Sequence, residues 1–115
     1  MKVVKINQAE AQESTSPLFK GKVSTQPIAG EEEGEVRVFM VNFNPGAVNM
    51  FHTHTFDQVL YVTEGKGIVA TDNEEITVTP GTFIFIPAGE KHWHGATKDT
   101  AFSHIAINPP GKTSF

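Results

Sequence analysis

The sequence predicts an all-β fold, either a sandwich or a small barrel. Short stretches of alternating or continuous apolar residues recur along most of the 115-residue chain, and Gly and Pro residues separate them. No stretch shows a helical period of useful length. Many short strands at regular spacing, with turn residues between them, are typical of such folds.

The individual strands follow from these patterns. In the first of them, Glu35–Phe43, apolar residues alternate on both faces, which predicts a strand whose two faces are at least partly covered. The others are short apolar runs that end at Gly, Pro or Asp-Asn turn signals. They are Val59–Val62, Ile68–Thr71, Ile76–Val78, Thr82–Ile86 and Ala101–Ile107. Before the first strand, Asn7–Ser16 has room for one helical turn at most.

Composition limits the domain count and the partners. We expect one domain over residues 1–115, with an N-terminal arm (1–17) and an extended or frayed C-terminal tail (109–115). An apolar fraction of 38% with nine Phe suffices for a packed interior. A net charge of -4 argues against nucleic-acid binding, which needs a basic patch.

Several other protein classes are excluded or disfavoured. No apolar run has the length that spans a bilayer, so we expect no membrane partner. The first residues lack the apolar core of a secretion signal, so we expect a cytoplasmic protein. The chain has no cysteine, which excludes disulfides, thiolate zinc sites and cysteine nucleophiles.

The histidines show the most informative spacing. All five lie between positions 52 and 104, and four form the pairs His52-Thr53-His54 and His92-Trp93-His94. Imidazole is the commonest metal ligand at neutral pH. A strand directs residues i and i+2 to the same face, so each pair offers two nitrogens to one face of a sheet. If the two strands meet, these nitrogens converge, which predicts a metal site.

A less specific interpretation of the histidines stays open. A single buried histidine is often only hydrogen-bonded to its surroundings, and a His-x-His pair also suits an exposed strand face. The glycines and the proline that frame both pairs favour the metal site over these alternatives.

The glycine frame around the histidines resembles the two sequence motifs of the cupin family. The first motif is similar to Gly46-x5-His52-x-His54-x3-Gln58-x6-Gly65, and the second to Gly81-x5-Pro87-x-Gly89-x2-His92. They occupy about 46–65 and 81–96. The resemblance implies a cupin double-stranded β-helix, which is a jelly-roll barrel. It also implies metal ligands at His52, His54, Gln58 and His92.

Two positions depart from the usual motifs. The chain has Gln58 where the first motif usually has Glu, and Ala96 where the second usually has Asn. Gln58 shares its parity with Leu60 and Val62, which suits an interior position. Three imidazoles and an amide are all neutral, so a divalent ion would keep its full charge and favour an anionic further ligand. Alternatively, Gln58 hydrogen-bonds to a ligating imidazole or to a bound water.

The C-terminal third resembles a subgroup of small bacterial cupins that includes the manganese-dependent hydroxynitrile lyases. The similarity covers residues 87–96 and 100–107, and Phe19-x-Gly21-x-Val23 fits the N-terminal region of the subgroup. It implies acid/base roles for His94 and His104 and a polar contact at Asn108, where those lyases usually have Gln. It also implies manganese or iron as the cofactor, with zinc and nickel left open.

The same resemblance implies a homodimer in which Val3–Ile6 or Phe19–Val23 joins the sheet of the partner. Three function classes then remain. The first is a metal-dependent enzyme on a small organic substrate, either a lyase or an oxygenase. The second is a non-catalytic module that binds a small anion or sugar, and the third is a structural cupin in which the metal only stiffens the barrel. A structural alternative for His94 and His104 is a backbone hydrogen bond in the barrel wall.

Overall fold

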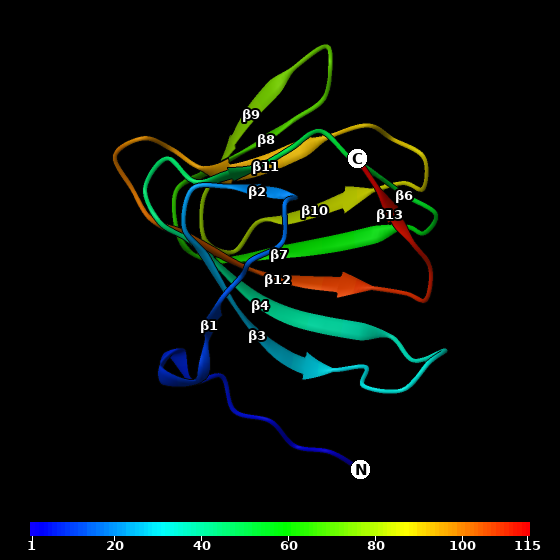
Figure 1. The fold of residues 1–115 in the computed structure, drawn as a ribbon. Helices are drawn as coiled ribbons and strands as arrows, with labels where there is room; N and C mark the ends of the chain where they lie inside the picture. The colour runs from blue at the N-terminus through cyan, green and yellow to red at the C-terminus, as the bar shows by residue number, and fades with distance from the viewer.

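The computed structural model describes residues 1–115 as two large antiparallel sheets and a two-stranded ribbon (Figure 1). One sheet fills the lower half of the view and the other lies above it, with the ribbon at the right. The prediction of an all-β fold is confirmed, since the only helical element is the short 3-10 turn η1 (Gln8–Glu10). No helix has the length and apolar character that a membrane crossing requires.

The two large sheets contain eleven strands between them. The six-stranded sheet has the spatial order β1 (Gln12–Glu13), β3 (Val23–Ala29), β4 (Arg37–Phe43), β12 (Phe102–Asn108), β7 (Gln58–Gly65) and β10 (Phe83–Ile86). The five-stranded sheet has the order β2 (Phe19–Lys20), β5 (Val48–Asn49), β11 (Trp93–Ala96), β8 (Gly67–Ala70) and β9 (Glu75–Val78). The ribbon pairs β13 (Thr113–Ser114) with β6 (Thr53–His54).

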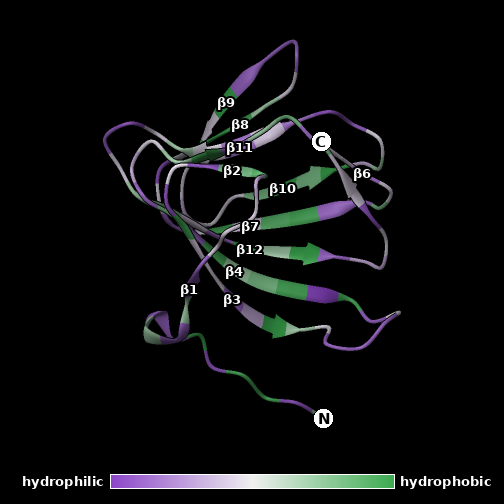
Figure 2. Cartoon of the chain, viewed as in Figure 1, coloured by the Kyte–Doolittle hydropathy of each residue, from purple (hydrophilic) through white to green (hydrophobic).

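The hydrophobic core lies between the two large sheets, because both contribute to one apolar cluster. Figure 2 shows the apolar stretches concentrated in β4, β7, β10 and β12, with hydrophilic residues in the loops. The cluster of 11 buried side chains consists of Val23, Val41, Phe43, Ala47, Leu60, Val62, Val78, Ile86, Ala96, Phe102 and Ala106. Burial of this apolar area is the main stabilising contribution to such a fold.

Each of the six strands predicted from the apolar pattern is present, with bounds shifted by a few residues. β3 and β11 were not predicted. β3 contains Gln26 and Pro27 and has a register irregularity between Pro27 and Ala29, so its alternation is broken. β11 contains His94, which the argument from the His-x-His spacing requires to be extended, but Gly95 leaves the segment without an apolar run. The chain end is extended, as expected, but Thr113 and Ser114 pair with β6 instead of fraying.

Candidate metal centre

The two His-x-His segments lie side by side. The backbone N–H of His52 donates to the carbonyl of His92 (2.9 Å), and the N–H of His92 donates to the carbonyl of His52 (3.0 Å). His54 follows on β6. One ring nitrogen from each of His52, His54 and His92 lies within 4.8 Å of the others, and all three side chains are buried. Backbone pairing therefore brings three imidazoles from distant parts of the sequence to one point.

Hydrogen bonds fix the orientation of each of these rings. Nδ1–H of His52 donates to the carbonyl oxygen of Met50 (2.7 Å), and Nδ1–H of His92 donates to that of Glu90 (2.8 Å). Nδ1 of the third ring, that of His54, forms a hydrogen bond with the hydroxyl of Thr113 (2.8 Å). Because Nδ1 is occupied in every ring, Nε2 is the atom left to bind a ligand.

Gln58 brings an oxygen to the same cluster. It is the first residue of β7 and is 4% exposed. Its Nε2 donates to Oδ1 of Asn108 (2.8 Å), while its Oε1 has no hydrogen-bond partner. Nε2 of His54 and Nε2 of His92 are also buried and unpartnered. A buried polar atom without a partner costs about 1–3 kcal/mol, so a ligand bound to these atoms would remove that cost.

A divalent transition metal fits these donors. Burial is the main cause that lowers the pKa of His52 and of His54 to about 4, and the neighbouring imidazoles contribute to this lowering. Burial also lowers the pKa of His92. The rings are therefore neutral at neutral pH, which is the state that binds metal. Three imidazole nitrogens and one amide oxygen suit manganese, iron, zinc or nickel alike.

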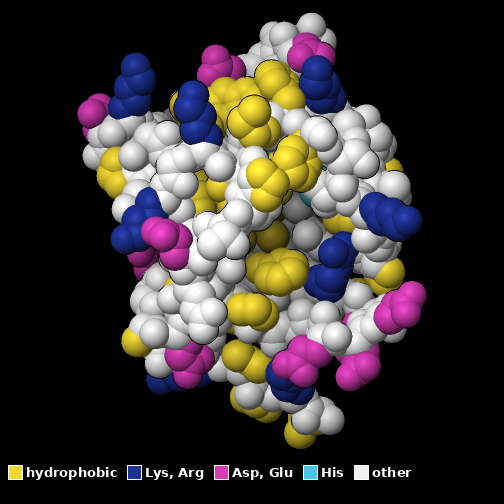
Figure 3. All heavy atoms as spheres, viewed as in Figure 1, with side chains coloured by type: hydrophobic (Ala, Val, Ile, Leu, Met, Phe, Trp, Pro, Cys, Tyr) yellow, Lys and Arg dark blue, Asp and Glu magenta, His cyan; other side chains and the backbone are white.

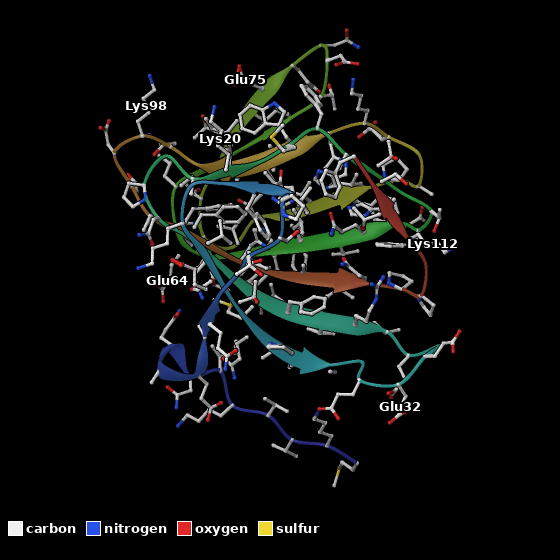
Figure 4. All side chains as sticks on the ribbon, viewed as in Figure 1. Lys20, Glu32, Glu64, Glu75, Lys98 and Lys112 are labelled. Atoms are coloured by element: carbon white, nitrogen blue, oxygen red, sulfur yellow. The ribbon has the colours of Figure 1, made fainter.

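A cavity of about 200 Å³ opens beside the histidine cluster. In Figure 3 the surface is hollowed near the centre of the view, between hydrophobic side chains. Gln58, His52 and His54 line the polar side of the cavity, while His92, the third histidine of the cluster, is not among its lining residues. The apolar side of the cavity consists of Leu18, Phe19, Phe39, Val41 and Ala106. Figure 4 shows the labelled Lys20, Glu64, Glu75 and Lys98 pointing outward, away from this interior.

His94 and His104 line the same cavity but belong to a separate pair. Their ring centroids are 5.0 Å apart. His104 lies on β12, with the rings of Phe43 and Phe102 each at 5.5 Å, and neither of its ring nitrogens has a hydrogen-bond partner. Burial lowers the pKa of His104 to about 4 and that of His94 well below 6.5. Both are neutral at neutral pH, so each can accept a proton from a bound molecule.

Two residues of the site have no signal in the sequence. Asn49 on β5 is 4% exposed; its Oδ1 accepts the backbone N–H of His94 (2.8 Å) and its Nδ2 lies 3.2 Å from Nε2 of that ring. Thr113 contacts His54 from the C-terminal tail. Asparagine and threonine near chain turns are common for structural reasons, so neither residue type indicates a site by itself.

Two known enzymes are similar to this chain in sequence. The (R)-mandelonitrile lyase of Granulicella tundricola is 32% identical over 109 residues, which cover 93% of this chain and 83% of the lyase. The acireductone dioxygenase of Trichormus variabilis is 28% identical over 89 residues, covering 65% of this chain and 49% of the dioxygenase.

The fold is also similar to that of a solved structure. The crystal structure of a cupin-like protein from Thermotoga maritima has a TM-score of 0.87 and 29% identity, covering 92% of this chain and 84% of that one. Residues 39–108, which contain both histidine pairs, match the cupin domain. The chain therefore belongs to the cupin family.

Proposed function

We propose that this cupin is a divalent-metal-dependent enzyme that acts on a small organic substrate through lyase-type acid/base chemistry. The observation that carries the proposal is the presence of two kinds of histidine in one site. His52, His54 and His92 gather ring nitrogens within 4.8 Å of one another, with Nε2 of His54 and of His92 unpartnered, and Gln58 adds an unpartnered oxygen. His94 and His104 lie in the adjoining cavity as neutral imidazoles outside that donor set.

In this proposal His52, His54, Gln58 and His92 hold the metal, and manganese or iron is proposed ahead of zinc or nickel. When bound, the ion supplies a positive charge that favours anionic atoms of a substrate or product. The donors carry no charge of their own, so they leave this positive charge undiminished.

The other two histidines are proposed to move protons. In the cleavage of a cyanohydrin, neutral His104 or His94 takes the hydroxyl proton, and the oxygen electrons form the carbonyl bond. The bond to the nitrile carbon breaks, and its electron pair leaves with cyanide. Return of the proton to cyanide restores the neutral imidazole, so the atoms and charges balance. The similarity to a mandelonitrile lyase supports the choice of a cyanohydrin.

The cavity supports a substrate of this size and polarity. A cavity of about 150 Å³ holds benzene, so the volume of about 200 Å³ accommodates a ring with a short polar substituent. Phe39 and Val41 on β4 and Phe19 on β2 offer apolar contacts, while the histidines lie on the polar side. An apolar body and a small polar head therefore match the two sides of the cavity.

A dioxygenase is the second candidate. The similarity to an acireductone dioxygenase favours it, although this chain covers 49% of that protein. Dioxygenase activity in this chain would use the same site residues as the proposed lyase activity. Consumption of dioxygen distinguishes the two activities. A non-catalytic module that binds a small ligand would show neither activity.

The test uses protein reconstituted with manganese or iron. Benzaldehyde release from mandelonitrile and dioxygen uptake are measured for the wild type, for His104→Gln and for the exposed control Lys98→Ala. We expect His104→Gln to keep its metal and to lose about 10²–10⁴-fold in turnover, the usual contribution of acid/base catalysis. Full turnover in His104→Gln contradicts the role of that residue. A wild type that holds metal but shows neither activity contradicts the enzyme.

We further propose that the protein forms a homodimer through its N-terminal arm. Phe19–Lys20 already pairs with β5 and Val23 with β4 within one chain, whereas Val3–Ile6 belongs to no strand and can reach a partner. Val3 is 88% exposed, and the edge strand β10 exposes 69% of Phe83 and 64% of Phe85. Light scattering should show a dimer for the full chain and a monomer after deletion of residues 1–6. A monomeric full chain contradicts this proposal.

A further inference from the structure

The C-terminal segment 108–115 is held at several points against Arg37 of β4 and against Thr55, which directly follows His54. The carbonyl of Pro109 accepts a hydrogen bond from the Arg37 guanidinium (3.1 Å). The backbone N–H of Lys112 donates to Oγ1 of Thr55 (2.9 Å), and its carbonyl accepts from the N–H of Thr55 (3.0 Å). Gly111 passes so close to this turn that a Cβ there would lie 2.5 Å from Thr55 Oγ1. The tail is therefore fixed beside the cluster rather than free.

Thr113 determines the direction of one proposed donor. It lies opposite His54 in the β13–β6 pair, and its hydroxyl forms a hydrogen bond with His54 Nδ1 (2.8 Å). In the tautomer that leaves Nε2 free for a metal, Nδ1–H is the donor of this bond. Since the imidazole is rigid, holding Nδ1 at Thr113 also fixes where Nε2 points, which is toward His52 and His92.

Asn108 determines which end of the Gln58 amide faces the cluster. Its Oδ1 accepts a hydrogen bond from Gln58 Nε2 (2.8 Å), which leaves Oε1 as the unpartnered atom on the other side. If the Gln58 side-chain amide rotated by 180°, its NH₂ group would face the cluster in place of its oxygen, and N–H donors do not coordinate a cation. The acceptor oxygen of Asn108 disfavours this rotated orientation, because it would lose the hydrogen bond from Gln58 Nε2.

We propose that Asn108 and Thr113 are positioning residues that fix the donor atoms of Gln58 and His54, so that the C-terminal tail is a functional part of the metal site. The inference rests on the proposed metal binding by those ligands. It assigns Asn108 a different role from the catalytic contact that the family resemblance implies, because its carbonyl oxygen is already occupied by Gln58.

The test measures metal affinity, which does not depend on any reaction. Dissociation constants for Mn²⁺ and Zn²⁺ are determined by chelator competition for the wild type, Asn108→Leu, Thr113→Val and the exposed tail control Ser114→Ala. We expect Asn108→Leu to lose about 10–100-fold in Mn²⁺ affinity, the usual effect of removing such a partner. We expect about tenfold for Thr113→Val, at the low end because Thr113 is exposed and water can replace its hydroxyl.

Ion selectivity distinguishes positioning from a general loss of structure. Oxygen donors suit Mn²⁺, while imidazoles bind Zn²⁺ well. Asn108→Leu should therefore weaken Mn²⁺ more than Zn²⁺, whereas Thr113→Val should weaken both ions alike. Asn108→Asp and Thr113→Ser keep the acceptor oxygens and should restore most of the affinity.

The possible outcomes separate the two proposals. Wild-type affinity in both Asn108→Leu and Thr113→Val overturns the positioning roles while the metal site stands. A wild type that binds neither ion overturns the metal site and the positioning roles together. Equal losses in Ser114→Ala, or no rescue by Thr113→Ser and Asn108→Asp, show disruption of the tail and overturn the positioning roles.

Discussion

The burial of His104 should make the metal-free protein sensitive to mild acid. The side chain is 1% exposed, and burial lowers its pKa from 6.5 to about 4. In the unfolded chain the pKa returns to its ordinary value. Below pH 6.5 the unfolded chain therefore binds a proton that the folded chain does not. The contribution to stability is fully present above about pH 6.5 and is lost as the pH falls toward about 4.

The size of the effect follows from these two pKa values. The full difference, reached below both pKa values, corresponds to about 3 kcal/mol in the free energy of unfolding. Between pH 7 and pH 5 the loss from His104 alone is about 2 kcal/mol. The other four histidines have lowered pKa values as well, so they act in the same direction and steepen the dependence of the whole protein.

Urea unfolding at pH 7 and at pH 5, after removal of metal with a chelator, measures this effect. The single tryptophan, Trp93, is half-buried on β11 and supplies the fluorescence signal. His104→Gln cannot titrate, so it should lose about 2 kcal/mol less than the wild type between the two pH values. Phe102→Leu removes packing next to His104 without removing a proton site, and it should keep the wild-type pH dependence. Equal losses in His104→Gln and the wild type would refute the reasoning.

Two further changes test the charge of the site and the core. Gln58→Glu adds a carboxylate to a neutral donor set, so it should tighten divalent-ion binding and weaken azide binding to the metal-loaded protein. Unchanged azide affinity in a titration contradicts a neutral donor set. Leu60→Ala removes a side chain that is 0% exposed and should cost about 2–5 kcal/mol by urea unfolding. The exposed Glu64→Ala on the same strand should stay within about 0.5 kcal/mol, and a similar cost for both contradicts the core assignment.

Local patterns in the sequence sufficed for six of the strands and for the strand faces on which several single residues lie. The alternation in 35–43 predicts β4, and the shared parity of Gln58, Leu60 and Val62 agrees with their burial on one face of β7. The shared burial of His52 and His54 agrees with their spacing. These properties depend on the period of an extended backbone, which neighbouring residues determine by themselves.

The partners of these residues depend on the tertiary structure alone. Thr113 reaches His54 across 59 positions, and Asn49 reaches His94 across 45. Nothing near either residue in the chain indicates that contact. Strand register between distant segments is decided by the packing of both sheets around one core. The sequence by itself therefore determined an all-β chain with two histidine pairs. Only the folded packing decided which side chains orient those rings and which atoms they leave free.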